Sequence, residues 1–282
     1  MSLLSLLFVL SSTVGIGTPA ELPNWPEAAG PTGGVFLTDA EAARARDRSE
    51  EARWAKKIRT SLIASADALV EESLEIPRAG GQWPHWFTCK EDGGRLRSRS
   101  PTEHVCTVCG KVYSGWPYDQ VYISRRHGHW LGGLRTLGWA YALTQNPAYP
   151  VRARAILLEY ASFYDTLELH DVHGKQSSAK ARLFAQTLDE AVALCRIALG
   201  YDLVCTAECF SPEDHARIAE RLLRPMVATI QPNQRGISNW QSWHNAAVGC
   251  VGAVLRDREL LDWAINGDDG FLYQMEHSVM ES

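Results

Sequence analysis

The chain lacks an excess of positive charge, a cysteine framework and any long apolar stretch. Its 28 Lys and Arg are outnumbered by 33 Asp and Glu, so the net charge of -5 excludes the global positive field of a non-specific nucleic-acid binder. Seven Cys is an odd number, and a chain of 282 residues buries a large core without disulfides. Because 45% of the residues are hydrophobic, disorder is excluded as well. We expect a globular protein that binds no nucleic acid and whose local clefts are able to bind an anionic ligand.

The longest apolar run near the N-terminus is short. Residues 3–10 are apolar and are followed by small residues and by Thr18-Pro19-Ala20, an arrangement typical of a signal peptide and its cleavage site. The run is too short to cross a bilayer, so we expect no stable membrane span. Residues 1–22 predict a signal peptide of a secreted or periplasmic protein, although no positively charged region precedes the run. The alternative is a frayed N-terminus of a cytosolic protein.

Strand patterns are almost absent, and helical patterns are abundant. Residues 23–38 are rich in Pro and Gly and predict a linker. Apolar spacing then predicts one long helix over residues 39–72. Further helices are expected over six stretches: 118–145, 148–166, 180–206, 211–230, 239–255 and 257–266. Short connections favour antiparallel hairpins, so residues 39–282 predict an all-α fold whose hairpins close as a ring or stack as a solenoid. No residue-level repeat supports the solenoid.

Residues 80–118 differ from the rest of the chain because they are dense in Gly, Pro, His, Cys and Trp and show no helical period. A stretch of this kind needs an organising element, and a metal ion would provide one. The expected donors are three thiolates and a carboxylate at knuckle spacing: Cys89, Asp92, Cys106 and Cys109. His104 or His85 is the alternative fourth ligand. We expect a closed, structural zinc site in this insertion; redox-active or simply free thiols are the alternatives.

A second polar cluster begins the helix expected over residues 239–255. Asn239, Trp240, His244 and Asn245 precede small residues that allow close helix packing, which would turn the polar side chains toward a shared cavity. An amide can hydrogen-bond a carboxyl group, and an imidazole can move a proton near neutral pH. Asn239 and His244 are therefore the expected catalytic residues. The structural alternative is that Asn239 caps the helix and His244 is a satisfied core histidine.

Five polar stretches together resemble the heparinase II/III-like and oligoalginate lyase group of polysaccharide lyases: 106–115, 118–119, 169–175, 186–191 and 239–247. The resemblance covers most of residues 39–282. It implies an (α/α) toroid that carries the catalytic cleft and is followed by an antiparallel β-sandwich domain. Here the resemblance predicts an incomplete toroid, with the zinc-knuckle insertion and without the β-sandwich.

The resemblance also implies β-elimination at a uronic acid of an anionic polysaccharide. A neutraliser acts on the C5 carboxylate, a base removes the C5 proton and a tyrosine protonates the leaving oxygen. Asn239 matches the neutralising position, and His244 is the nearest imidazole that can assist. The remaining expected contacts are substrate-binding residues: Tyr118, Tyr122, Arg126, Trp240 and Asn245. The family's tyrosine lies in a Gly-Tyr-His context that does not occur before Ser282, so the resemblance predicts a fragment with little or no activity of its own.

Two other functions fit the sequence. A toroidal glycoside hydrolase needs two carboxylates that flank the scissile bond. Four acids are available for that role: Asp119, Asp171, Asp189 and Glu190. A non-catalytic, zinc-stabilised carbohydrate-binding module would instead bind the polymer without releasing product.

Overall fold

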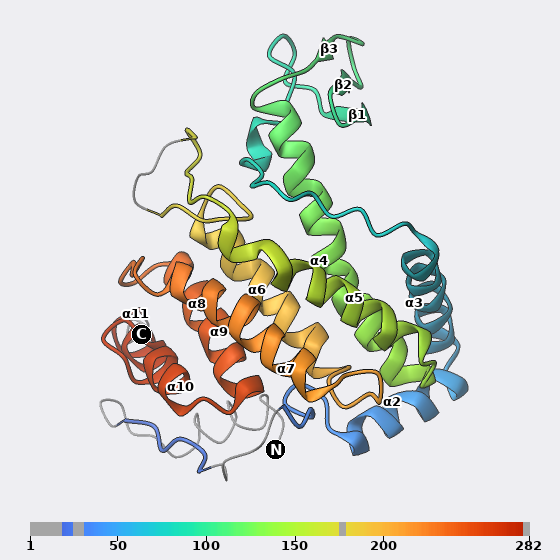
Figure 1. The fold of residues 1–282 in the computed structure, drawn as a ribbon, viewed down its shortest axis with the longest axis vertical. Helices are drawn as coiled ribbons and strands as arrows, with labels where there is room; N and C mark the ends of the chain where they lie inside the picture. The colour runs from blue at the N-terminus through green and yellow to red at the C-terminus, as the bar shows by residue number, and fades with distance from the viewer. Residues whose placement is uncertain (1–18, 25–30, 175–178, 279–282) are drawn as a thin grey trace.

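The computed structural model describes residues 19–24, 31–174 and 179–278, and most of the predicted signal peptide lies outside these ranges. Ten α-helices lie in the described ranges (Figure 1): α2 (Asp39–Glu51), α3 (Arg53–Glu71), α4 (Tyr118–Thr144), α5 (Ala148–Phe163), α6 (Thr187–Asp202), α7 (Pro212–Ile218), α8 (Arg224–Ile230), α9 (Asn239–Leu255), α10 (Arg258–Ile265) and α11 (Phe271–Ser278). Short 3-10 turns occupy Pro84–Trp86 and Tyr164–Thr166, and a π turn at Ala219–Leu223 joins α7 to α8. No helix in the described ranges is long and apolar enough to cross a bilayer.

Helices α4, α6 and α9 pack side by side, and α5, α8 and α10 pack against them. Glycine allows the closest approach between α4 and α6, because a Cβ at Gly200 would lie 2.8 Å from Cβ of Leu134. Likewise, a Cβ at Gly138 would lie 2.8 Å from Cβ of Leu203. The second contact lies further toward the C-terminus than the first on both sides, from Leu134 to Gly138 and from Gly200 to Leu203. Helices α4 and α6 therefore run in the same direction.

The segments that lead into these central helices meet at one end of the helical body. The backbone N–H of Gly81 donates to the carbonyl of Leu183, before α6, and that of Gln82 donates to the carbonyl of Gln120 in the first turn of α4. The backbone N–H of Ala179 donates to Oδ1 of Asn233, which precedes α9, at 3.0 Å. The N-terminal ends of α6 and α9 therefore lie at the same end of the body.

The core of the helical body consists of large side chains from the central helices, from α5 and from the 3-10 turn that follows α5. Its fully buried members include Trp130, Tyr160, Tyr164, Leu194 and Tyr201. The Pro- and Gly-rich stretch before α2 is also attached to this body, because the backbone N–H groups of Val35 and Phe36 donate to the carboxylate of Asp202.

Three helix boundaries differ from the sequence prediction. The helix expected over 39–72 breaks at Ala52, whose extended conformation (ψ 127) separates α2 from α3. The helix expected from residue 180 begins only at Thr187, because the buried Glu190 carboxylate accepts the backbone N–H groups of Leu183 and Phe184 and holds them in a loop. The helix expected over 211–230 contains the π turn between α7 and α8.

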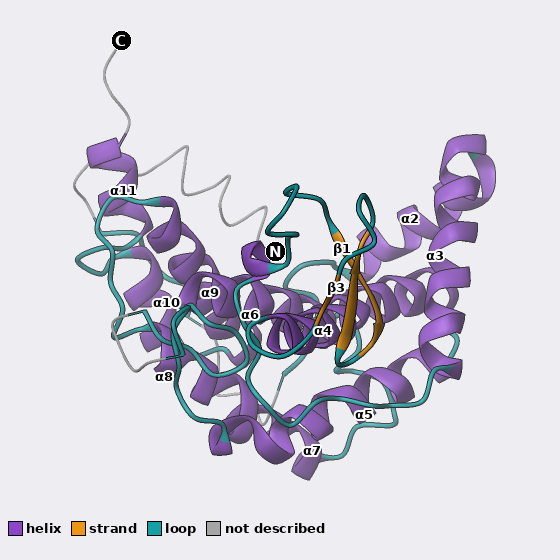
Figure 2. Cartoon of the chain, turned by 90° about the horizontal axis from the view of Figure 1, so that it is seen from above, coloured by secondary structure: helices purple, strands orange, loops and turns teal. Residues whose placement is uncertain are grey.

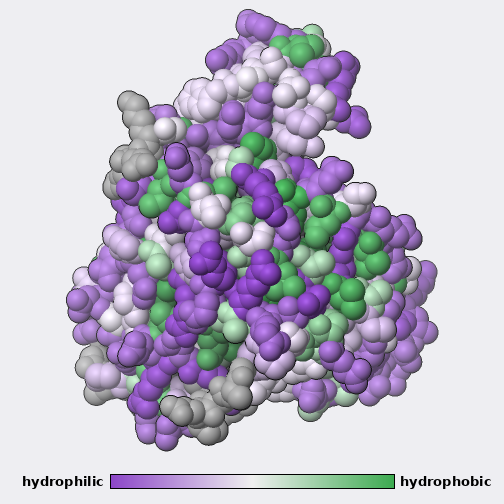
Figure 3. Space-filling model, in the orientation of Figure 1, coloured by the Kyte–Doolittle hydropathy of each residue, from purple (hydrophilic) through white to green (hydrophobic). Residues whose placement is uncertain are grey.

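The insertion at residues 80–118, here called the knuckle module, contains a small sheet that the sequence analysis did not predict. Strands β1 (Leu96–Ser100), β2 (Glu103–Cys106) and β3 (Val112–Tyr113) pair antiparallel in the order β1-β2-β3. The sheet stands beyond the N-terminal end of α4 (Figures 1 and 2), and Figure 3 shows the module as a lobe that projects from the helical body. The prediction of a helical fold with a small insertion is confirmed, with this sheet added; closure into a toroid stays a prediction.

Candidate functional site

Helix α9 begins at Asn239, as predicted, but Asn239 does not cap it. The cap is Ser238, whose Oγ accepts the backbone N–H of Gln241 at 3.2 Å. The structural alternative for Asn239 is therefore wrong. Its side chain is exposed and makes no hydrogen bond to any residue that the structure describes. An unbonded amide thus lies at the positive end of the helix dipole, where an anionic group is favoured.

His244 lies five residues further along α9, about 1.4 turns, and is buried. Its Nε2 atom has no hydrogen-bond partner among the described residues, so the alternative of a fully satisfied core histidine is also wrong. Burial lowers the pKa of His244 to about 4, and the positive charge of Arg235 acts in the same direction, against a hydrogen bond to the backbone of Asn233. The imidazole is therefore neutral near pH 7 and keeps an acceptor or donor position free.

Trp240 lies beside His244, and Arg235 lies over Trp240. The ring of Trp240 lies 6.4 Å from that of His244 in an edge-on arrangement, and the guanidinium of Arg235 lies 5.2 Å from the Trp240 ring centre. An arginine next to an indole combines a charge for a carboxylate with an apolar face for a sugar ring. The structure therefore brings the predicted Trp240 next to the predicted catalytic pair and adds Arg235.

Asn245 is bonded into the framework of the site. Its Nδ2 donates to the carbonyl of Asp269 at 2.8 Å, and its Oδ1 accepts Nε2 of Gln241 at 2.9 Å. Oε1 of Gln241 in turn accepts the backbone N–H of Arg235 at 2.8 Å. Gln241 and Asn245 thus fix the loop that carries Arg235. The sequence analysis missed Gln241, although its spacing of four residues from Asn245 on a helix could have indicated the pair.

The N-terminal end of α6 contributes a second set of polar groups. Burial raises the pKa of Asp189, against a bond from Gln186 Nε2 at 2.9 Å and the nearby charges of His85 and Arg196. His85 is exposed on the 3-10 turn Pro84–Trp86 and lies near enough to Asp189 to act on it electrostatically. This long-range neighbour could not be predicted from local spacing.

The four acids of the hydrolase hypothesis have separate structural partners. Glu190 accepts the Tyr164 hydroxyl at 2.7 Å in addition to two backbone N–H groups, and burial raises its pKa to about 7. Asp119 contacts His104 at 3.0 Å and accepts the backbone N–H of Gly115. Asp171 is buried and accepts the backbone N–H of His173.

The predicted substrate residues of α4 lie in its first turns. Tyr118 is buried in the knuckle module, with its ring 4.8 Å from that of Tyr113, and the ring of Tyr122 lies 6.2 Å from that of His104. Arg126 forms an ion pair with Glu72 at 2.8 Å. Their roles in substrate binding stay predictions.

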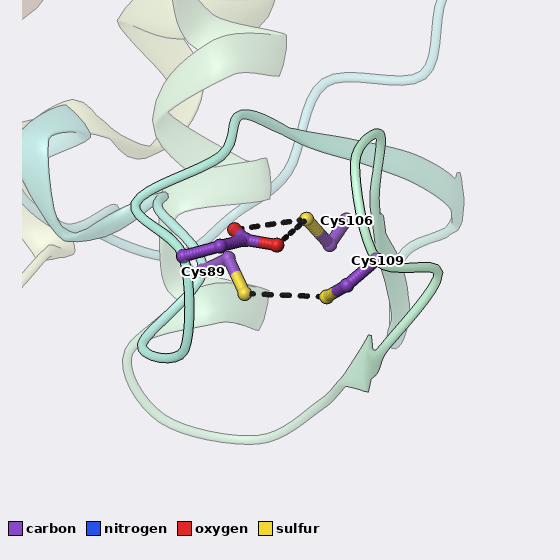
Figure 4. A group of neighbouring side chains, drawn as sticks. Cys89, Cys106 and Cys109 are labelled. Carbon is purple, nitrogen blue, oxygen red and sulfur yellow. Dashed lines mark hydrogen bonds between the residues drawn. The ribbon is translucent and has the colours of Figure 1, made fainter.

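The four predicted metal donors come together in the knuckle module. The ligand atoms of Cys89, Asp92, Cys106 and Cys109 all lie within 4.8 Å of one another, and Figure 4 shows the three thiols turned toward a common centre. The sulfur atoms of Cys89 and Cys109 are 3.7 Å apart, and Cys106 Sγ lies 3.4 Å from Asp92 Oδ1. A tetrahedral zinc ion at about 2.3 Å from its sulfur ligands separates them by about 3.8 Å. The donor set therefore fits zinc.

The donors stand on two turns of the same construction. Gly93 follows Asp92 with φ +70, and its N–H donates to the carbonyl of Cys89. Gly110 follows Cys109 with φ +76, and its N–H donates to the carbonyl of Cys106. Both turns need a left-handed residue that glycine adopts without strain. The equivalence of the turns supports Asp92 as the counterpart of a knuckle cysteine.

Tyr113 lies directly behind the donors, and the sequence analysis missed it. Its hydroxyl is 3.1 Å from Cys89 Sγ and accepts the backbone N–H of Lys90 at 3.0 Å. Burial raises the pKa of Cys89, but the bonds from Tyr113 and from nearby backbone groups outweigh it, so the pKa is lowered. The Tyr113 hydroxyl therefore donates to the thiolate form of Cys89.

The alternative fourth ligands have other neighbours. His104 is fully buried between Ser98 Oγ, 2.9 Å from Nδ1, and the carboxylate of Asp119. His85 lies beside Trp83 and near Asp189. Neither belongs to the donor group that the described residues form.

A hollow of about 560 Å³ lies beside α10 and α11. Its lining includes Asp268, Asp269 and Tyr273 and contains none of the predicted site residues, although the carbonyl of Asp269 accepts the hydrogen bond from Asn245. We therefore place the candidate site at the starts of α6 and α9 on chemical grounds rather than on the size of a hollow.

Comparisons with known proteins agree on one enzyme family. A family model described as alginate lyase matches residues 118–277, which include Asn239 and His244 and leave out the four metal donors. An alginate lyase of Stenotrophomonas maltophilia is 37% identical over 151 residues, 51% of this chain and 20% of that protein. An exo-oligoalginate lyase of Saccharophagus degradans is 30% identical over 164 residues, 55% and 22% of the two chains. The matched part of this chain thus spans about a fifth of either relative's length.

Among solved structures, alginate lyase A1-III from Sphingomonas species A1 superposes on 80% of this chain and 56% of its own, with 14% identity and a TM-score of 0.49.

Proposed function

The chain belongs to the alginate lyase family, and on that premise we propose that it cleaves a uronic-acid polysaccharide, alginate, by β-elimination. The observation that carries the proposal is the polar start of α9: the unbonded amide of Asn239 and, five residues along the helix, a neutral imidazole whose Nε2 atom has no hydrogen-bond partner among the described residues. Elimination needs these two groups, a donor for the sugar carboxylate and an acceptor for the C5 proton. Hydrolysis needs a pair of free carboxylates instead.

The chemistry assigns one step to each residue. A proton beside an ionised carboxylate is only weakly acidic, so donors must stabilise the negative charge that develops when it leaves. The Asn239 amide and the positive end of α9 supply this stabilisation. His244 Nε2 accepts the C5 proton, a double bond forms between C4 and C5, and the C4–O bond breaks. The leaving oxygen takes up a proton from water.

The negative charge of a bound substrate would raise the pKa of His244, the proposed base. The positive charge of Arg235 helps to lower the pKa of His244 in the free protein. A uronate carboxylate bound to Arg235 would compensate that charge and place a negative group near the imidazole, which raises the pKa of His244 toward neutrality. A base is most effective when its pKa lies near the working pH.

The test follows the unsaturated uronate by its ultraviolet absorbance, with alginate, heparin and heparan sulfate as substrates. We expect product from alginate and a loss of about 10²–10³-fold in Asn239→Ala, the size of effect seen when a charge-stabilising donor is removed. Asn146→Ala, in the turn between α4 and α5, is the control and keeps the activity. New reducing ends without absorbance would support a hydrolase, and binding without product would support a binding module.

We also propose that the knuckle module holds a structural zinc ion through Cys89, Asp92, Cys106 and Cys109. The proposal rests on the donor distances and on the two equivalent turns. Four protein ligands complete a tetrahedral site, so no position remains for substrate. The zinc ion would fix the shape of the module and take no part in the elimination. Export of the protein stays a prediction.

A further inference from the structure

Three tryptophans form a continuous row on the knuckle module: Trp83, Trp86 and Trp116. The ring centres of Trp83 and Trp86 are 6.0 Å apart at 77°, and those of Trp86 and Trp116 are 6.2 Å apart at 46°. Trp116 is 55% exposed in the segment between β3 and α4. We call these residues the indole row.

The indole row does not serve as the core of the module. That core lies around Phe87, Tyr113 and Tyr118, which are buried, and Trp86 only packs against it. The indole nitrogen of Trp86 is buried and has no hydrogen-bond partner in the described part of the chain. Trp116 packs against Trp86 but stays exposed, so it lacks the burial that a core position would provide. Its surface is therefore available to a ligand.

The indole row is continuous with the candidate site. The ring of His85 lies 4.6 Å from that of Trp83 and near Asp189 at the start of α6. The same segment is bonded to the body, because the N–H of Gly81 donates to the carbonyl of Leu183. A polymer bound at the starts of α6 and α9 would therefore meet the row where it leaves the helical body.

Two cations lie over rings of the module's core, against which Trp86 packs. The guanidinium of Arg125 lies 4.6 Å from the ring centre of Phe87, next to Trp86 in sequence, and the ammonium of Lys90 lies 5.9 Å from that of Tyr118. Both cations are exposed, and neither forms an ion pair within the described ranges. Apolar faces beside unpaired cations suit a ligand with both an apolar face and an anionic group.

We propose that the indole row is a sugar-binding subsite for a uronic acid unit outside the reacting pair. The C–H face of the pyranose packs on Trp116, which Trp86 and Trp83 hold in place, and the sugar carboxylate binds Arg125. The inference rests on the proposed function, since it takes the polymer that the lyase would cleave as its ligand. It extends that function because the knuckle module would then make the protein bind longer uronate oligosaccharides more tightly than short ones.

The test measures binding of a uronate disaccharide and a uronate hexasaccharide by calorimetry, in an Asn239→Ala background so that no product forms. We expect Trp116→Ala to weaken hexasaccharide binding about tenfold and to leave the disaccharide unchanged, and Arg125→Gln to do the same. Trp116→Phe keeps an aromatic face and should bind within about threefold of the parent. Trp54→Ala is the matched control, since Trp54 is 59% exposed on α3, away from the module.

Two outcomes would overturn the inference while leaving the proposed function intact: equal hexasaccharide affinity in Trp116→Ala and its parent, or an equal loss in Trp54→Ala. Absence of binding of either oligosaccharide by the parent, together with absence of unsaturated product from the native chain, would remove the proposed function as well. Zinc content and helical circular dichroism, measured for each variant, establish that Trp116→Ala keeps the module folded.

Discussion

In the helical body, whole layers of large side chains such as Trp130, Tyr160 and Leu194 are fully buried, whereas the knuckle module buries a small set around Phe87 and Tyr113. The body holds its shape by apolar burial, and its helices need no further support. The module has too little core for that and gathers four metal donors instead. The comparison shows two solutions to the same problem of stability within one chain.

The two regions also treat charge in opposite ways. In the body, burial lowers the pKa of both His127 and His244 to about 4 and raises that of Glu190 to about 7, so buried groups tend toward their neutral forms. In the module, hydrogen bonds from Cys109, Gly94 and other neighbours lower the pKa of Asp92 to about 2. In the same module a backbone hydrogen bond from Lys111 lowers the pKa of Cys109, but the bond to Asp92 and burial outweigh it and raise that pKa to about 12. The body thus excludes charge, whereas the module keeps one ionised carboxylate among its thiols.

Removing the proposed zinc ion should have the largest effect, because it should unfold the knuckle module and leave the helical body folded. Cys106→Ala, or a strong chelator, should take the zinc content from one ion per chain to near zero and unfold the module, because structural zinc contributes about 10–16 kcal/mol in small zinc domains. Tryptophan fluorescence would report the exposure of Trp83 and Trp86, while far-ultraviolet circular dichroism should keep the helical signal of the body.

The matched control is Cys209→Ala, which removes a half-buried thiol of the body that lies outside the donor set. It should keep one zinc ion per chain. If Cys106→Ala bound zinc as tightly as the native chain, the four residues would not be the ligands, and the module would need another source of stability.

The features that local spacing determines could be predicted from the sequence. Knuckle ligands three residues apart identify the donor set, and the capping pattern at Ser211 identifies the start of α7, where the structure has a capping box. The polar start of α9 was located correctly, although the cap is Ser238 and not Asn239. Such features depend on neighbours within one turn, which the sequence shows directly.

The features that depend on distant partners could not be predicted. The break at Ala52 has no Gly or Pro to mark it. The late start of α6 results from the buried Glu190 carboxylate, which a sequence shows only as one more acid in a helix. Strand β1 has the sequence LRSRS, which has little preference for strands, and only its pairing with β2 makes it one. The position of His85 beside Asp189 is likewise set by tertiary packing.

Lowering the pH should destabilise the helical body, because it forces a proton onto the buried His127. Burial lowers the pKa of His127 to about 4 from its ordinary 6.5, against a hydrogen bond to the carbonyl of Ala79. The unfolded chain therefore takes up this proton at higher pH than the folded chain does. The stability from a neutral His127 is complete above pH 6.5 and is lost as the pH falls toward 4, by up to about 3 kcal/mol.

Urea unfolding between pH 6.5 and pH 4 measures this loss. His127→Gln is expected to be less stable throughout but to show a shallower dependence on pH, because one titrating group is gone. His129→Gln is the control from the same helix, since His129 is exposed and contacts Glu72. Identical slopes for the native chain and His127→Gln would mean that His127 does not resist protonation, and the contrast between the two regions would weaken.

The smallest expected effect is a change in zinc affinity within the knuckle module. Tyr113→Phe removes the hydroxyl that bonds Cys89 Sγ at 3.1 Å and keeps the ring that packs in the core. Partners behind metal ligands typically account for a factor of about 10–100 in metal affinity, so competition with a chromogenic chelator should show weaker zinc binding by that amount. Tyr118→Phe is the matched control, because its ring packs at a tilt against that of Tyr113 and its hydroxyl makes no hydrogen bond in the described ranges. If both variants lost affinity equally, the module would depend on ring packing, as the body does; if only Tyr113→Phe lost it, the donor network rather than the core would hold the module together.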